Sequence, residues 1–261
     1  MAYTIAISSQ KGGVAKTTTT LSLAGALADQ GYRILAIDLD PQGNLGLGLG
    51  IQTKQLTYSL ADILLNAMPS KNVRVATGIK GIDVLPANKH LQLAERYLPS
   101  RPRYQYALKD VLAPMKEEYD YILLDCPPSL STLTTNALVA AQMALLPTQA
   151  EYFSAYALKP MLQMLRSVRE RHNPTLIYRI LLTMFRRRNR AHRIVRSRLE
   201  ATFGSGLCQT IIETDTKLRE AAIAGKPITH FSPRTRSAGQ YRALAQELVT
   251  YVQKEIIAQT A

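Results

Sequence analysis

A short loop from Lys11 to Thr17 carries the residue types that hold phosphate, because its sequence is Lys-Gly-Gly-Val-Ala-Lys-Thr. Glycines let backbone N–H groups approach phosphate oxygens, a lysine can reach terminal phosphates, and a threonine hydroxyl can bind Mg²⁺. We therefore predict a nucleoside triphosphate site, with Lys16 on the terminal phosphates and Thr17 on the metal ion. The generic P-loop pattern expects glycine at two positions that this chain fills with Gln10 and Ala15.

The segments on either side of this loop have the patterns of a strand and a helix. Tyr3 to Ser8 is an apolar run of strand length, and Thr17 to Gln30 has apolar and small residues at helical spacing before Gly31. A helix that begins at the loop adds the partial positive charge of its amino terminus. The loop is thus predicted to join a buried strand to a helix, which is the context that phosphate binding requires.

Carboxylates follow two other segments with a strand pattern. Arg33 to Asp38 leads into Asp40-Pro-Gln-Gly-Asn, and Tyr121 to Asp125 leads into Cys-Pro-Pro-Ser. Open α/β sheets bind ligands at the carboxyl ends of their strands, and a carboxylate there can hold Mg²⁺ directly or through water. We predict that Asp125 and Asp38 support the metal ion.

The paired lysines Lys11 and Lys16 resemble the deviant Walker A motif of the ParA/MinD group of ATPases. The resemblance implies that the chain binds ATP and Mg²⁺ and that Lys11 crosses a dimer interface to phosphates held by a partner subunit. It also implies that Asp125 is the Walker B aspartate and that Asp40 orients the attacking water. The implied nucleotide contacts are Lys11, Gly12, Gly13, Val14, Ala15, Lys16, Thr17 and Thr18, with Thr183, Met184, Ser232 and Pro233 near the purine.

Ala15 departs from the glycine that is usual in this group. An alanine with positive φ is strained by about 1 to 2 kcal/mol. We therefore expect either that the backbone at Ala15 stays in an ordinary region or that nucleotide affinity is weakened.

The rest of the chain alternates strand-like and helical patterns. The strand-like runs are Ile82 to Pro86, Met143 to Thr148 and Ile177 to Met184, and the helical stretches are Leu130 to Ala141, Tyr156 to Arg171 and Gln240 to Ile257. This alternation predicts an α/β fold with a doubly wound, mostly parallel twisted sheet flanked by helices on both faces. We find no linker composition or internal repeat, so residues 1–261 are expected to form a single domain, with an exposed loop at Pro99 to Arg103.

Several further segments resemble the ParA/Soj branch of the group. They are Thr135 to Leu138, Leu146 to Gln149, Leu218 to Ala221, Gly225 to Ile228 and Tyr241 to Ala245. The resemblance implies a P-loop ATPase that partitions a chromosome, a plasmid or another cargo. In such proteins an ATP-dependent homodimer binds nonspecific double-stranded DNA, and slow hydrolysis, stimulated by a ParB-like partner, releases it.

Positive charge is concentrated in the second part of the chain. Residues 151–261 carry 19 Lys and Arg against 8 Asp and Glu, whereas residues 1–150 carry 13 against 11. Arginine at this density, without a known base-reading motif, favours contacts to the DNA backbone. The predicted DNA-binding residues are Arg186, Arg187, Arg188, Arg190, Arg193, Arg196, Lys217 and Arg219. Ile194, Val195, Leu199 and Phe203 are expected to face inward on a helix and leave the arginines outside.

Other interpretations remain open at this point. The arginines could form a solvated face or contact acidic protein or lipid. A MinD-like membrane-associated ATPase would need an amphipathic basic tail, but Leu244, Leu248, Val249, Val252 and Ile256 are better explained as a core helix. A DNA-coating protein with little hydrolysis would share the site, whereas an amide ligase would need a further substrate domain and an iron–sulfur reductase paired cluster cysteines.

Composition narrows the environment and the metal chemistry. Cys126 and Cys208 do not make a disulfide framework, and the four histidines lack metal-ligand spacing. No apolar stretch reaches membrane-spanning length and the first strand starts without a signal peptide, so we expect a cytoplasmic, nucleoid-associated protein with no membrane contact.

Overall fold

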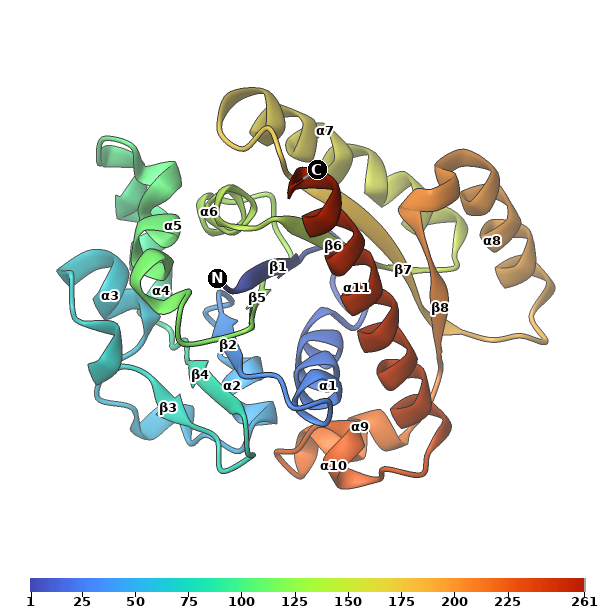
Figure 1. The fold of residues 1–261 in the computed structure, drawn as a ribbon, viewed down its shortest axis with the longest axis horizontal. Helices are drawn as coiled ribbons and strands as arrows, with labels where there is room; N and C mark the ends of the chain where they lie inside the picture. The colour runs from blue at the N-terminus through green and yellow to red at the C-terminus, as the bar shows by residue number, and fades with distance from the viewer. Residues whose placement is uncertain (261) are drawn as a thin grey trace.

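The structure is a computed structural model. It describes the backbone of residues 1–260, and the side chains of these residues except Lys54, residues 152–157, Ile256 and residues 258–260. The chain forms one eight-stranded sheet in the order β3-β4-β2-β5-β1-β6-β7-β8, with helices on both sides of it (Figure 1). The strands are β1 (Tyr3–Ile7), β2 (Ile34–Asp38), β3 (Val75–Ala76), β4 (Ile82–Leu85), β5 (Tyr121–Asp125), β6 (Met143–Gln149), β7 (Ile177–Phe185) and β8 (Leu207–Glu213).

Neighbouring strands are parallel except at one edge, where β3 and β4 are antiparallel. Successive side chains of a strand point to opposite faces of the sheet. Because helices cover both faces, the parallel strands are buried on both sides. Ile5 and Ile7 of β1 pack into one hydrophobic cluster and Ala6 into the other. The predicted doubly wound, mostly parallel sheet is therefore confirmed.

The first face of the sheet, which carries Ile5 and Ile7, is covered by helices whose apolar side chains share that cluster. They are α1 (Lys16–Ala28), α2 (Asn44–Gly48), α9 (Lys217–Ile223), α10 (Ile228–Phe231) and α11 (Arg236–Thr260). Leu244, Leu248, Val249 and Val252 are buried, so α11 is a core helix in this region as predicted, and the side chain of Ile256 lies outside the described residues.

The second face of the sheet is covered by the other helices. They are α3 (Leu60–Asn66), α4 (Leu91–Tyr97), α5 (Ala107–Leu112), α6 (Thr132–Ala140), α7 (Tyr152–Arg171) and α8 (Arg190–Phe203). The residues from Pro99 to Arg103 are exposed, as expected of a loop, although Leu98–Ser100 forms a short 3-10 turn. Within the part of the chain that is described, no helix is long and apolar enough to cross a membrane.

The predicted strands and helices are observed with ends that differ by up to a few residues, but two strands were not predicted. One is β3, which has only two residues. The other is β8, an edge strand whose apolar pattern is interrupted by Gln209 and Thr210. The ends of β1, β2, β5, β6, β7 and β8 lie along one edge of the sheet, and this edge carries the candidate site.

Candidate active site

The loop between β1 and α1 has the backbone geometry of a phosphate cradle. Gly13 has φ 74°, and Ala15, immediately before α1, has φ 66° and ψ 36°, which is the left-handed region. Of the two alternatives expected at Ala15, the ordinary backbone region is therefore excluded, and weakened nucleotide affinity stays a prediction. A Cβ atom at Gly12 or Gly13 would meet no atom within 4 Å, so open space borders the loop where phosphate oxygens would lie.

The carbonyl groups of this loop are held by the protein. Gln149 Nε2 donates to the Gly13 carbonyl at 3.1 Å, and Thr183 Oγ1 donates to the Val14 carbonyl at 3.0 Å. A trans peptide directs its N–H group opposite to its C=O group. The N–H groups that follow these carbonyls consequently point away from the protein contacts, as anion binding requires.

Lys16 is the first residue of α1, and only 8% of its surface is exposed. Its Nζ donates to the Lys11 carbonyl at 3.3 Å, which folds the side chain back over the loop. Burial lowers the pKa of Lys16, and the nearby carboxylates of Asp125 and Asp40 act in the opposite direction. The amino group is thus placed to offset negative charge inside the loop.

Asp125 and Thr17 form the candidate metal pair. Thr17 Oγ1 donates to Asp125 Oδ2 at 2.7 Å, and Thr20 Oγ1 donates to Asp125 Oδ1 at 3.1 Å. Burial raises the pKa of Asp125 to about 7, although the two hydroxyl groups and Lys16 oppose that rise. A carboxylate beside a threonine hydroxyl offers the oxygen ligands that Mg²⁺ prefers, so these residues fit that ion.

Asp38 lies beside Asp125 on the neighbouring strand β2, but its oxygens are bound to backbone groups. Its Oδ1 accepts from Asp40 N at 3.1 Å, and its Oδ2 accepts from Leu45 N at 3.0 Å and Gly46 N at 3.3 Å. Burial and the charge of Asp125 raise the pKa of Asp38 well above its ordinary value. Asp38 therefore shapes the turn that carries Asp40, and its predicted support of the metal stays a prediction.

Asp40 lies in that turn, is partly exposed, and accepts a hydrogen bond from Gln42 N at 2.9 Å. Its charge acts on both Lys16 and Asp125, which places it at the same edge of the sheet. Among the described residues, no group of three or more His, Cys, Asp or Glu could hold a metal ion. Thr17 and Asp125, which are in contact, would supply oxygen ligands to a cation here, together with water and the phosphates of the ligand.

The first lysine of the motif contacts the end of β6 and the residues after it. Lys11 Nζ lies 2.8 Å from Glu151 Oε2 and 3.1 Å from Gln149 Oε1. Lys11 is half-buried in this arrangement, at the rim of the loop. Its predicted reach across a dimer interface stays a prediction.

A hollow of about 420 Å³ adjoins the loop, and its lining includes Met184, one of the residues expected near the purine. It is lined by Gly13, Ala15 and Thr18 from the loop and α1, by Met184 and Arg186 after β7, and by Ile212 to Thr216, Leu218 and Arg219. Thr183 contacts the loop instead of the hollow, and Pro233 is exposed and not part of the lining. The wall built from β8 was not predicted, because β8 itself was not predicted.

The predicted DNA-binding residues lie close together but in two groups. Arg187, Arg193 and Arg196 line a groove of about 620 Å³ between α8, β8 and α11, whereas Arg186 and Arg219 line the hollow beside the loop. Arg188, Arg190 and Lys217 are exposed. Arg196 and Lys217 pair with Glu200 and Glu220 on their own helices, at 2.6 Å in both cases.

The inward stripe of α8 was only partly correct. Leu199 is buried, and Val195 and Phe203 pack against the core, but Ile194 is 46% exposed. Ile194 and Val195 are adjacent on the helix, and a narrow contact with the sheet can bury only one of them. The exposed face therefore carries Ile194 beside Arg190, Arg193 and Arg198.

Comparison with known proteins finds relatives along nearly the whole chain. A family model described as an AAA domain matches residues 2–178. The chromosome partitioning protein ParA of Myxococcus xanthus is 40% identical over 247 residues, which cover 94% of this chain and 87% of the relative. The sporulation initiation inhibitor protein Soj of Bacillus subtilis is 39% identical over 249 residues, which cover 95% of this chain and 98% of the relative.

Solved structures give the same result. The cobyrinic acid a,c-diamide synthase of Mycobacterium smegmatis, with a bound ATP analogue and magnesium, matches with a TM-score of 0.82 and 32% identity. The match covers 97% of this chain and 96% of that chain. With two relatives near 40% identity and a phosphate cradle in the expected place, this chain belongs to the ParA/Soj family of P-loop NTPases.

Proposed function

We propose that this chain is a DNA-partition ATPase that uses ATP and Mg²⁺ to switch its hold on nonspecific double-stranded DNA. The observation that carries this proposal is the short path from the nucleotide hollow to the arginines. Met184 lines the hollow at the end of β7, and the next residues are Phe185 and the run Arg186 to Arg188. A ligand in the hollow and a polyanion on the arginines would thus bear on one continuous segment.

The roles of the loop residues follow from their contacts. Lys16, the backbone N–H groups from Gly12 to Thr18 and the amino terminus of α1 would hold the phosphates. Thr17 and Asp125 would hold Mg²⁺, with Asp38 supporting the site through the turn that carries Asp40. Bound ATP supplies the phosphoryl group and Mg²⁺ offsets its charge, and Asp40 would orient water for in-line attack.

Dimerisation is the proposed link between ATP and DNA. Lys11 would leave Glu151 and Gln149 and contact the phosphates held by a second copy of the chain. Two arginine surfaces would then face the same DNA, and affinity would depend steeply on salt because each phosphate contact releases counterions. We expect slow hydrolysis by the chain alone and stimulation by a ParB-like partner, on the nucleoid in the cytoplasm.

The test is binding of nonspecific duplex DNA without nucleotide, with ADP, with ATP and with a non-hydrolysable analogue, at two salt concentrations. We expect salt-sensitive binding only with triphosphate. Lys16→Ala should abolish nucleotide-dependent dimers, and charge reversal at Arg187, Arg190 and Arg193 should abolish DNA binding but preserve ATP binding. Binding that ignores nucleotide, or survives the charge reversal, would refute the proposal.

Two other functions compete with the proposed one, namely a DNA-coating protein and an amide synthase. A DNA-coating protein would bind DNA with ATP but release no phosphate above background when DNA and partner are present. The protein from M. smegmatis carries the name of a diamide synthase, and the match covers 96% of that chain and 97% of this one, so the lack of a further substrate domain does not separate the two functions. The relatives from Myxococcus xanthus and Caulobacter vibrioides, which are 40% and 38% identical to this chain, are both named chromosome partitioning protein ParA, and this favours the proposed function.

A further inference from the structure

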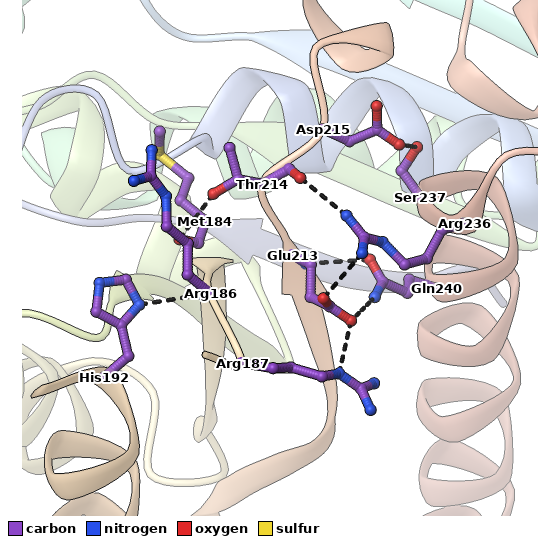
Figure 2. A network of polar contacts seen from close by, with 10 residues as sticks. All are labelled: Met184, Arg186, Arg187, His192, Glu213, Thr214, Asp215, Arg236, Ser237 and Gln240. Atoms are coloured by element: carbon purple, nitrogen blue, oxygen red, sulfur yellow. Dashed lines mark hydrogen bonds and ion pairs between the residues drawn. The ribbon is translucent and has the colours of Figure 1, made fainter. Parts of the chain in front are cut away.

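Glu213, the last residue of β8, is a buried carboxylate at the centre of a polar network. Figure 2 shows Arg187, Arg236 and Gln240 converging on its side chain from a loop and from α11. Arg187 Nε lies 2.9 Å from Oε1, Gln240 Nε2 lies 2.9 Å from the same oxygen, and Arg236 Nη1 lies 3.1 Å from Oε2. Among the described carboxylates that pair with the predicted DNA-binding residues, Glu213 contacts two arginines, whereas Glu200 and Glu220 each contact one basic side chain.

The same residue forms part of the nucleotide hollow. Thr214, next in the chain, donates its hydroxyl to the Met184 carbonyl at 3.0 Å and accepts from Arg236 Nη2 at 3.0 Å through its own carbonyl. Met184 has φ 52°, a strained backbone conformation for a side chain of this type. The arginine segment after β7 is therefore fastened to the wall of the hollow at Met184 and at Glu213.

The contact with Glu213 uses only the Nε atom of Arg187 and leaves its two terminal nitrogens available for another partner. Glu213 takes the Nε donor, and the side chain of Arg187 is still 78% exposed, against 7% for Glu213. The carbonyl of Arg187 is also held, because Arg193 Nη1 donates to it at 3.2 Å. The guanidinium is thus restrained at one nitrogen, and its two terminal nitrogens face solvent, where they match the two-pronged geometry of a phosphate group.

We propose that Glu213 is a positioning residue that orients Arg187 toward the DNA backbone and fastens it to the nucleotide hollow. This inference rests on the proposed function and concerns how its DNA surface is built. Holding an arginine in its binding geometry lowers the conformational entropy that is lost on binding. The arrangement therefore strengthens phosphate binding although it places a negative charge beside a polyanion.

Charge and positioning predict opposite results when Glu213 is removed. If charge alone mattered, loss of a carboxylate would tighten DNA binding. If Glu213 positions Arg187, Glu213→Ala should weaken DNA binding about twofold to tenfold with the ATP analogue, which is the typical cost of immobilising one flexible side chain on binding. Glu213→Gln keeps one acceptor oxygen and should fall between wild type and Glu213→Ala.

The matched control is Glu200, which is exposed and pairs with Arg196 at 2.6 Å on the same surface. Unlike Glu213, which is 7% exposed, Glu200 is 46% exposed, so water screens its pair with Arg196 and the pair restrains that arginine little. Glu200→Ala therefore removes the same charge without touching Arg187, and it should leave DNA affinity unchanged or higher. The double variant Arg187→Ala/Glu213→Ala should bind no more weakly than Arg187→Ala alone. That result would show that Glu213 acts through Arg187 and not through the general stability of the fold.

The experiment measures the affinity of each full-length variant for a short duplex, by fluorescence anisotropy, with the ATP analogue and without nucleotide. Weakened binding in Glu213→Ala, partial rescue in Glu213→Gln and no added loss in the double variant would support the inference. Unchanged or tighter DNA binding in both Glu213→Ala and Glu213→Gln would overturn it. Fully additive losses of affinity in Arg187→Ala/Glu213→Ala would also overturn it. Failure of the wild type to show nucleotide-dependent DNA binding would instead refute the proposed function and, with it, this inference.

Discussion

Replacement of Ala15 by glycine should stabilise the protein, although the same change inside a helix destabilises. Ala15 has φ 66° and ψ 36°, a left-handed conformation that costs an alanine about 1 to 2 kcal/mol. Glycine removes this strain but adds backbone freedom to the unfolded chain, which offsets about 0.4 to 1 kcal/mol. The net gain in the free energy of unfolding should therefore be roughly 0.5 to 1 kcal/mol.

Chemical denaturation measures this gain, provided that the slope with denaturant stays constant. Ala24, which is buried within α1, is the matched control, because Ala24→Gly should lower the free energy of unfolding by about 1 kcal/mol or more. Gly13→Ala should also lower the free energy of unfolding, because Gly13 has φ 74°, which is strained for alanine. The added methyl group would meet no atom within 4 Å, so no packing contact would offset that strain. If Ala15→Gly destabilised the protein as Ala24→Gly does, the left-handed geometry at Ala15 would be refuted.

Three further predictions follow from other contacts. Asp40→Ala should trap the dimer on DNA with ATP, because water is no longer oriented for attack. A positioned base contributes about 100-fold to 10,000-fold to the rate, so phosphate release faster than about one-tenth of the wild-type rate would contradict this role. The raised folded-state pKa of Asp125, about 7, means that its charge opposes folding as pH rises from about 4 to above 7. We would unfold Asp125→Asn in the presence of a chelator and without nucleotide. The substitution should raise the free energy of unfolding little near pH 4 and by up to about 4 kcal/mol at pH 8. A gain that does not depend on pH would be evidence against a buried charge at Asp125. Glu247→Ala should lower the free energy of unfolding by about 2 to 3 kcal/mol in urea, because Glu247 accepts from Gln209 N and Thr210 N and pairs with Arg179, and a change below about 0.5 kcal/mol would show that water replaces it.

Much of the fold could be predicted because its signals are local. The strand, the Gly-rich loop and the helix around Lys16 are contiguous, and apolar runs such as Tyr121 to Asp125 are long enough to indicate buried strands. β8 escaped prediction because its middle residues are polar. Gln209 and Thr210 are accommodated at the sheet edge by Glu247, which is far away in the sequence, and no local pattern reveals that partner.

The candidate site divides in the same way. The sequence predicted that Lys16, Thr17 and Asp125 lie near one another, because the loop after one strand and the end of another meet at the same edge of a parallel sheet. The pairing of β1 with β5 and the contact of Thr17 with Asp125 agree with this. The contact of Lys11 with Glu151 depends on β6 lying beside β1, and the wall of the hollow depends on β8 following β7 in the sheet. These are properties of strand order.

The amino-acid sequence by itself determined the type of chemistry, the α/β architecture and the concentration of positive charge after residue 150. Residue type, short-range spacing and hydrophobic periodicity carry that information. Only the tertiary structure decided the left-handed backbone at Ala15, the exposure of Ile194 and the burial of Glu213 between Arg187 and Arg236. Each of these depends on which distant segments pack against the residue, and that is settled by the closing of the whole core and not by the residues next to it in the chain.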